Sequence, residues 1–249
     1  MLQAATIPIS LTGLSNGIFT AMRLVLFDID GTLLRAQGLG LVVMERVGRR
    51  LLGPAFTLEG IDFGGALDPW IFRQAAVRLG HDDPSHLHPK FRDAYLAELE
   101  RELDLGEERR PILLPGVLAA LAAFRGDPAA TLGLVTGNYG RAVPLKLRAA
   151  GIDPAQFVVG AFGDDAPTRP DLVRLAMEQW RARGADPDPQ RVVVIGDTPR
   201  DVDCAKKNGC RSIAVATGWH TAEQLEAGGA DLVLRDLTEL MGRLDTLWD

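Results

Sequence analysis

Two carboxylates stand two residues apart directly after a short apolar run, in the string Asp-Ile-Asp-Gly-Thr at residues 28–32. Side chains two apart in extended backbone point to the same side, so Asp28 and Asp30 can face one site. Phosphoryl transfer to a carboxylate needs a nucleophile, a proton carrier for the leaving oxygen and a cation that offsets phosphate charge. Asp28 suits the first role and Asp30 the second. The alternative is an acidic turn with local hydrogen bonds only.

A second acidic pair follows another apolar run, in the string Gly-Asp-Thr-Pro-Arg-Asp at residues 196–201. Asp197 at a strand end, facing Asp28, would make an oxygen-rich site suited to magnesium. Thr198 followed by Pro199 reads as the start of a helix, and Asp201 then completes a capping box. We expect Asp201 to cap this helix, to support the metal, or to do both.

Neutral phosphate ligands are predicted in the string Thr136-Gly137-Asn138, which also follows an apolar run. A hydroxyl at the end of a strand, followed by a glycine amide, can hold phosphate oxygens through uncharged donors. The alternative is a simple turn in which Thr136 caps the next helix.

A cation is also required, and Arg169 is the first candidate. It precedes Pro170 at a predicted helix start, so the guanidinium and the free amides of the helix could meet an anion together. A loop arginine can equally be a solvated surface group. Lys146 is the rival candidate, although its position inside a predicted helix indicates a surface role.

Apolar runs rich in strand formers alternate with helical patterns along most of the chain, which predicts an α/β fold with a doubly wound parallel sheet, a Rossmann-like core. Ligands gather at the carboxyl ends of the strands in such a sheet, where the candidate residues stand. The predicted strands are 24–27, 131–135, 157–161, 192–195, 212–216 and 232–234, and the helices between them are 115–124, 141–150, 170–183 and 199–208.

Residues 35–110 break this rhythm with three helical patterns near 39–52, 69–80 and 89–103. Proline stands at the first helical position in two of them. We therefore predict an all-helical cap domain at 35–110, inserted into a hydrolase core domain formed by 22–34 and 111–249. Residues 1–21 are predicted to form an N-terminal extension.

Composition excludes several classes of function. The net charge of −6 is spread along 249 residues without the basic stripe of a nucleic-acid binder, so no nucleic-acid partner is expected. No run of about 18 apolar residues indicates a membrane span. Two cysteines in a chain of this length do not make a disulfide framework, and we expect a cytoplasmic protein.

The three strings at 28–32, 135–138 and 196–201, in this order and with a helical insertion after the first, resemble the haloacid dehalogenase-like hydrolase superfamily. The place of the insertion is similar to that in the subgroup typified by phosphoglycolate phosphatases. The resemblance covers about residues 22–241.

This resemblance implies Asp28 as the nucleophile and Asp30 as the acid and base. It implies that Asp28, the Asp30 carbonyl and Asp197 hold Mg²⁺, with Asp201 in support. The substrate phosphate would meet the residues already singled out for it, which are Thr136, Gly137, Asn138 and Arg169.

The chain departs from the family pattern in two places. The family usually carries a lysine before a Pro-x-Pro helix start, whereas this chain has Arg169-Pro170-Asp171. The arginine fork still binds phosphate, so the electrostatic role is retained. Leu67 replaces a threonine that is common in phosphoglycolate phosphatase-like caps, which loosens the inference about the substrate.

The expected function is a magnesium-dependent phosphatase that hydrolyses a small phosphorylated metabolite through an aspartyl-phosphate. A phosphosugar mutase would use the same two aspartates and stays an alternative, whereas a dehalogenase does not need Asp30. A catalytically silent binding or regulatory protein is the alternative from another class, and the intact Asp28, Asp30 and Asp197 speak against it.

Overall fold

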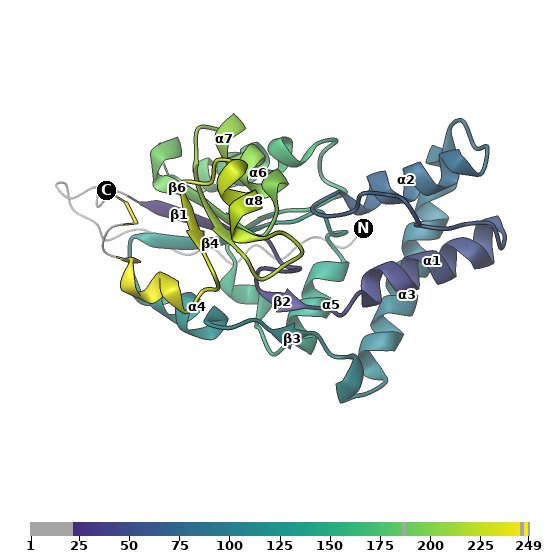
Figure 1. Ribbon diagram of the computed structural model, residues 1–249, viewed down its shortest axis with the longest axis horizontal. Helices are drawn as coiled ribbons and strands as arrows, with labels where there is room; N and C mark the ends of the chain where they lie inside the picture. Colours follow the sequence, from purple (N-terminus) through teal and green to yellow (C-terminus); the bar gives the residue numbers. More distant parts are fainter. Residues whose placement is uncertain (1–21, 186–187, 245–246, 249) are drawn as a thin grey trace.

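The computed structural model describes residues 22–185, 188–244 and 247–248 (Figure 1), so the predicted extension 1–21 lies outside the described residues. The core of the protein is a six-stranded sheet in which all neighbouring strands run parallel, in the order β5-β4-β1-β6-β7-β8. The predicted parallel sheet is thereby confirmed. Its strands are β1 (Arg23–Phe27), β4 (Ala130–Val135), β5 (Val159–Ala161), β6 (Val192–Gly196), β7 (Arg211–Val215) and β8 (Leu232–Leu234).

Alternate residues of the central strand β1 bury themselves against helices on opposite faces of the sheet. Val25 and Phe27 belong to one hydrophobic cluster with α4 and α5, whereas Leu24 and Leu26 belong to another with α6 and α7. Both faces are covered, which is why β1 is apolar throughout rather than alternating. The helices are α4 (Val117–Gly126), α5 (Ala142–Ala149), α6 (Arg169–Arg181), α7 (Pro199–Lys207) and, beside α7, α8 (Ala222–Ala227).

Three short elements lie outside the predicted set. Strands β2 (Leu34–Arg35) and β3 (Ile112–Leu113) pair antiparallel, and helix α8 follows β7. Two residues are too few to carry a periodic pattern, so the pairing of β2 with β3 could not be seen in the sequence. These strands bring together the two chain crossings that lead into and out of residues 35–110.

The segment 35–110, here called the helical insertion, lies to one side of the sheet (Figure 1). Its main helices are α1 (Leu39–Leu52), α2 (Asp68–Arg78) and α3 (His88–Asp104), close to the predicted bounds. Their apolar faces meet in a hydrophobic cluster of their own, to which the core adds Tyr139 and Ala142. No helix in the described part of the chain is long and apolar enough to cross a membrane.

Gly48 makes a close contact inside this insertion that any side chain would disturb. A Cβ at this position would lie 2.2 Å from the ring of Phe56, which is fully buried. Phe56 in turn lies 6.1 Å from the ring of Phe91, so it has little room to retreat.

Gly48→Ala should therefore lower the free energy of unfolding by about 1–2 kcal/mol, because overpacking outweighs the gain of about 1 kcal/mol in helix propensity. Gly126→Ala is the matched control, since a methyl group there meets nothing within 4 Å. Urea denaturation followed by circular dichroism measures both. Equal stability of the two variants would contradict the contact.

Candidate active site

The sheet register brings the candidate residues to one edge. Phe27 is aligned with Leu134 on β4 and with Ile195 on β6, and the Asp28 amide donates to the Ile195 carbonyl at 2.9 Å. The residues that follow these three strands therefore lie next to one another at the same edge of the sheet. The predicted convergence at the carboxyl edge of the sheet is what the structure shows.

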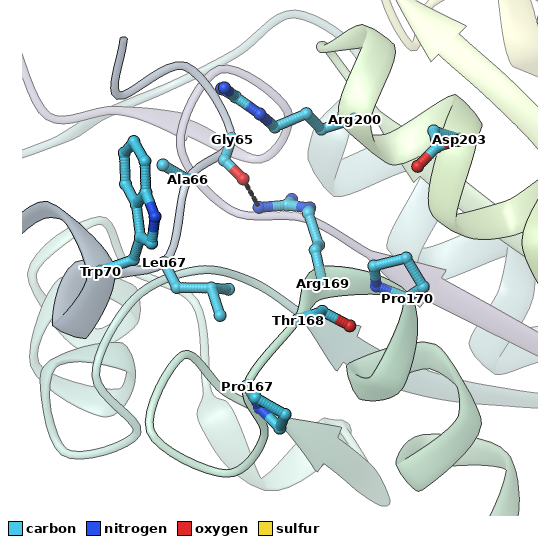
Figure 2. Close-up of a pocket in the computed structure, with 10 residues that line it drawn as sticks. All are labelled: Gly65, Ala66, Leu67, Trp70, Pro167, Thr168, Arg169, Pro170, Arg200 and Asp203. Carbon is cyan, nitrogen blue, oxygen red and sulfur yellow. Dashed lines mark hydrogen bonds between the residues drawn. The ribbon is translucent and has the colours of Figure 1, made fainter. Parts of the chain in front are cut away.

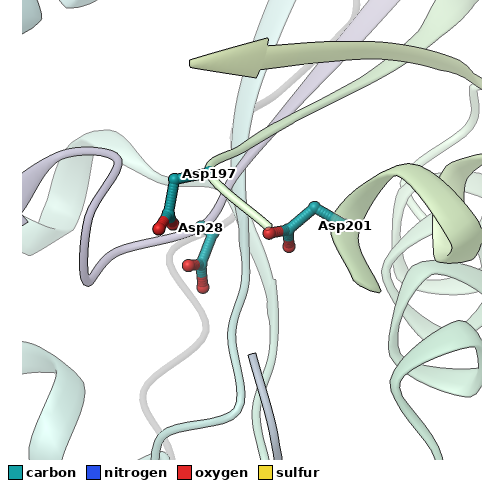
Figure 3. Close-up of side chains that lie close together, drawn as sticks. All are labelled: Asp28, Asp197 and Asp201. Atoms are coloured by element: carbon teal, nitrogen blue, oxygen red, sulfur yellow. The ribbon is translucent and has the colours of Figure 1, made fainter. Parts of the chain in front are cut away.

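Three carboxylates meet at this edge. Asp28, Asp197 and Asp201 point toward one another (Figure 3), and one oxygen of each lies within 4.8 Å of the others. Their exposed fractions are 4%, 2% and 2%. The hydroxyl of Thr32 donates to Asp197 at 3.2 Å, which fixes that side chain. Buried carboxylates at such spacing are oxygen ligands suited to a divalent cation.

The protonation of this cluster reflects its crowding. Burial, opposed in part by Arg169, raises the pKa of the Asp28 carboxyl to about 6. Burial together with Asp28 and Asp201 raises the pKa of Asp197 well above its usual range. Both shifts have the same physical origin, because negative charges without solvent repel one another. A bound cation would relieve this repulsion, so the carboxylates fit a metal site.

Asp201 both caps a helix and belongs to the carboxylate cluster. Its Oδ2 accepts the Thr198 amide at 3.0 Å and the Thr198 hydroxyl at 2.7 Å, while the Asp201 amide donates back to that hydroxyl at 3.3 Å. This capping box at the start of α7 confirms the predicted cap. The other oxygen, Oδ1, faces the interior of the site, where Arg169 donates to it.

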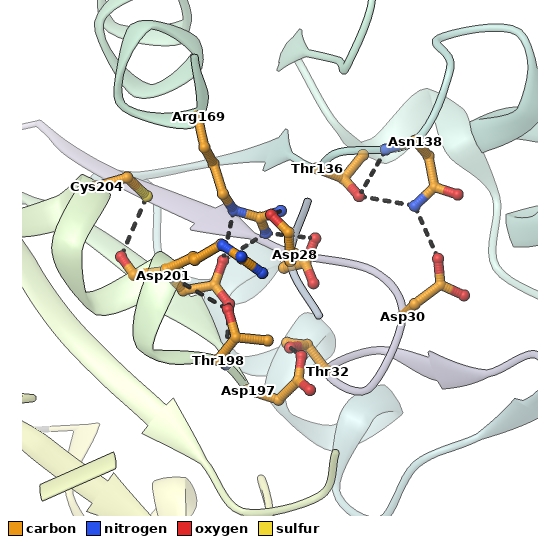
Figure 4. A network of polar contacts seen from close by, with 12 residues as sticks. Asp28, Asp30, Thr32, Thr136, Asn138, Arg169, Asp197, Thr198, Asp201 and Cys204 are labelled. Atoms are coloured by element: carbon orange, nitrogen blue, oxygen red, sulfur yellow. Dashed lines mark hydrogen bonds and ion pairs between the residues drawn. The ribbon is translucent and has the colours of Figure 1, made fainter. Parts of the chain in front are cut away.

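Arg169 is buried at the first turn of α6, which excludes the solvated surface alternative. Its Nη2 lies 2.9 Å from Asp28 and 2.5 Å from Asp201, and Nε also donates to Asp201 at 3.1 Å (Figure 4). Although burial lowers it, the two carboxylates raise the pKa of the guanidinium above its usual value. A permanent positive charge thus sits directly beside the predicted nucleophile.

Thr136, Gly137 and Asn138 form the turn that follows β4. The Thr136 hydroxyl accepts from the Asn138 side chain at 2.9 Å, and that same amide donates to Asp30 at 2.7 Å (Figure 4). The next helix begins only at Ala142, so Thr136 does not cap it. The turn therefore connects the predicted phosphate ligands to the predicted acid.

The expectation of a surface role for Lys146 is wrong. Only 4% of this residue is exposed, and its Nζ donates to Asp30 at 2.6 Å. The sequence did carry a signal for this, because Lys146 lies three and four residues from the apolar Val143 and Ala142, on the buried face of α5. A lysine in the apolar stripe of a helix favours an internal partner.

The stretch that leads into α2 packs directly on this edge. Asp68 donates its amide to the Gly137 carbonyl at 2.7 Å, and its carboxylate accepts the Tyr139 amide at 2.9 Å. A Cβ at Gly137 would lie 2.0 Å from the Ala66 carbonyl oxygen, so only glycine permits this approach.

Two arginines of the core hold the same stretch. Arg169 donates from Nη1 to the Gly65 carbonyl at 2.9 Å, and Arg200 binds the Gly64 carbonyl and Asp62. These contacts depend on tertiary packing and were not predicted from the sequence.

A cavity of about 280 Å³ lies between this stretch and the core (Figure 2). Leu67 and Trp70 line it from the insertion, and Pro167, Arg169 and Arg200 from the core. Its volume is near the lower end of the range for small-molecule sites, about 300–1,000 Å³. Arg169 borders both this cavity and the carboxylate cluster, so the two are neighbouring parts of one region.

Comparison with known proteins agrees with this geometry. A family model described as HAD-hydrolase-like, for haloacid dehalogenase, matches residues 169–240. The phosphoglycolate phosphatase of Vibrio vulnificus strain YJ016 is 28% identical over 88% of this chain and 95% of its own length.

Two solved structures share the fold. A hydrolase from Pseudomonas syringae has a TM-score of 0.69 at 19% identity and covers 90% of this chain and 99% of its own. A β-phosphoglucomutase from Clostridium difficile has a TM-score of 0.65 at 14% identity, with coverages of 91% and 97%.

The raised pKa of Asp28 predicts that divalent-cation affinity depends on pH, because protons compete for the same oxygen atoms. Mg²⁺ affinity should rise as the pH is raised from 5 to 8, because Asp28 and Asp197 both lose their protons more readily at higher pH. Below pH 6 it should fall up to about tenfold per unit for each proton displaced. Isothermal titration calorimetry measures this, with Glu178→Gln, an exposed residue in the last turn of α6, as the control that keeps the same profile. Equal affinity at pH 5 and pH 8 would contradict the assignment of the cluster as the metal site.

Proposed function

Because this chain belongs to the haloacid dehalogenase-like hydrolase superfamily and is a phosphoric monoester hydrolase, we propose that it hydrolyses a small-molecule phosphomonoester through an aspartyl-phosphate on Asp28. The observation that supports this most strongly is the setting of Asp28. This buried carboxylate lies close to the carboxylates of Asp197 and Asp201, and Nη2 of Arg169 lies 2.9 Å from its Oδ1.

We propose Mg²⁺ as the metal. Asp28, Asp197 and the Asp30 carbonyl would hold it, and Asp201 would support it from beside them. When bound, the cation supplies positive charge that offsets the phosphate and the carboxylates. Within the described part of the chain, the contacts to these three buried carboxylates include one guanidinium, which is too little positive charge to admit a phosphate dianion as well.

The reaction divides between Asp28 and Asp30. Asp28 attacks phosphorus while Asp30 gives a proton to the leaving alkoxide, and the ester bond breaks. Asp30 then takes a proton from water as the water attacks phosphorus, and the bond to Asp28 breaks to release phosphate. Thr136, Gly137 and Asn138 belong to the phosphate side of the site, and Arg169 stabilises the charge that develops on the phosphoryl oxygens.

We further propose that the helical insertion, residues 35–110, is the cap that selects the substrate.

A mutase would need a second phosphate-binding group on this cap. Most insertion arginines are already engaged by the insertion itself: Arg46, Arg50 and Arg109 bind the buried Glu98 or Glu102, Arg49 binds Glu45, and Arg78 binds the carbonyls of Glu59 and Gly60. This use of the arginines favours simple hydrolysis over a mutase.

The substrate would be a small phosphorylated metabolite, such as the one after which the phosphoglycolate phosphatase relatives are named.

Asp28→Asn should lower turnover of a generic aryl phosphate by about 10³-fold or more, because an amide cannot form the acyl phosphate. Excess chelator should abolish wild-type turnover, and added Mg²⁺ should restore it. Phosphate release measures both effects, with Glu178→Gln as a folded control that retains activity. Robust hydrolysis by folded Asp28→Asn would overturn the nucleophile, and full activity in chelator would overturn the metal.

Hydrolysis and phosphate transfer within a sugar give different products. We expect free phosphate from small phosphocarboxylates and no net isomerisation of hexose 1-phosphates. Enzymatic phosphate detection combined with NMR of the sugars follows both products. Isomerised sugar phosphate with little free phosphate would replace the phosphatase with a mutase.

A further inference from the structure

A buried lysine lies on the leaving-group side of the site, where the proposed reaction has so far needed only Asp30. Lys146 donates from Nζ to Asp30 Oδ2 at 2.6 Å and to Asn138 Oδ1 at 2.5 Å. A buried ammonium costs several kcal/mol unless its partners are well placed. This cost arises at Lys146, three residues before the end of α5, which calls for a function.

The amide of Asn138 has its orientation set by this lysine. Because Lys146 can only donate, the oxygen of the Asn138 amide must face it, and the nitrogen must face away. That nitrogen donates to Asp30 Oδ2 at 2.7 Å and to the Thr136 hydroxyl at 2.9 Å. Lys146 therefore acts on Asp30 twice, once directly and once by aligning Asn138.

Both donors converge on the same carboxylate oxygen. Among the described residues, Oδ2 of Asp30 takes the two hydrogen bonds and no hydrogen bond reaches Oδ1. The Asp30 side chain is 38% exposed, whereas that of Lys146 is 5% exposed. With Oδ2 occupied by donors, Oδ1 is the oxygen left to face the substrate.

We propose that Lys146 is a positioning residue that, with Asn138, holds Asp30 so that Oδ1 meets the leaving oxygen. The inference rests on the proposed phosphatase reaction. In the first step the O–H bond at Oδ1 breaks, its proton joins the leaving alkoxide, and the P–O ester bond breaks as Asp28 bonds to phosphorus. In the second step Oδ1 takes a proton from the attacking water, and the bond from phosphorus to Asp28 breaks.

A direct role of Lys146 in binding the substrate is less consistent with its surroundings. Helix α1 passes close to it, since a Cβ on Gly40 would lie 3.7 Å from Nζ and 3.2 Å from the Tyr95 hydroxyl. The helical insertion thus covers the lysine, and two of its three donors already bind protein groups. Its effect must reach the substrate through Asp30.

Lys146→Met tests this role with two esters of nearly equal shape, phenyl phosphate and 4-nitrophenyl phosphate. Phenol is the weaker acid and leaves only with a proton, whereas 4-nitrophenol leaves readily without one. Rapid quench measures the release of each phenol in the first turnover. Relative to wild type, Lys146→Met should slow the release of phenol at least about 10-fold more than it slows the release of 4-nitrophenol, since general acid catalysis contributes about 10²–10⁴-fold. Lys207→Met, which removes an exposed lysine on α7, should leave both rates unchanged.

A double-mutant cycle separates positioning from a structural role. In an Asp30→Asn background, Lys146→Met should cost nothing further, because its target is already gone. Asn138→Ala should show the same preference for the better leaving group, and it keeps the test available if Lys146→Met does not fold.

Three outcomes bear on the proposal. Equal slowing of both esters, or additive losses with Asp30→Asn, would overturn positioning in favour of a structural role. Rates equal to those of Lys207→Met would overturn any role of Lys146. Wild-type protein without turnover of either ester would instead overturn the proposed function itself.

Discussion

Mutual repulsion among buried carboxylates at the end of β1 is the constraint on which this site depends. Asp28 lies far along the chain from Asp197 and Asp201, and each of the three side chains is held in a different way. Strand pairing fixes the backbone of Asp28, the Thr32 hydroxyl fixes Asp197, and a helix cap fixes Asp201. The folded chain thus concentrates negative charge that a bound cation would neutralise, and this would allow a phosphate to approach.

The two aspartates of the first string have separate electrostatic environments although they are two residues apart. Asp28 meets Arg169 from α6, and Asp30 meets Lys146 from α5. These helices pack on opposite faces of the sheet, as the two hydrophobic clusters show. The proposed nucleophile and the proposed proton carrier are therefore each paired with a cation from a different helix.

Most of the fold and most of the carboxylate cluster could be predicted from the sequence. Apolar runs and proline positions placed the main strands and helices, because burial on both faces of a sheet leaves a local pattern. Asp28, Asp197 and Asp201 could be brought together because parallel strands end at a common edge.

What could not be predicted depends on distances between side chains. The sequence left Arg169 and Lys146 as rivals for one role, whereas each is buried beside its own aspartate. Strands β2 and β3 escaped detection because their pairing joins residues far apart in the chain. The contact of Gly137 with Ala66 likewise arises only when the insertion packs on the core.

That last contact bears on how such proteins can exchange parts. Backbone touches backbone at Gly137, so no change of rotamer can relieve a poor fit there. The carbonyls of Gly64 and Gly65 are received by Arg200 and Arg169, which belong to the core. A chimera that takes its insertion from a relative must therefore bring a matching turn after β4 and matching arginines. Insertion and core therefore have to be exchanged as a fitted pair, although in the described chain they are joined by only the two crossings at β2 and β3.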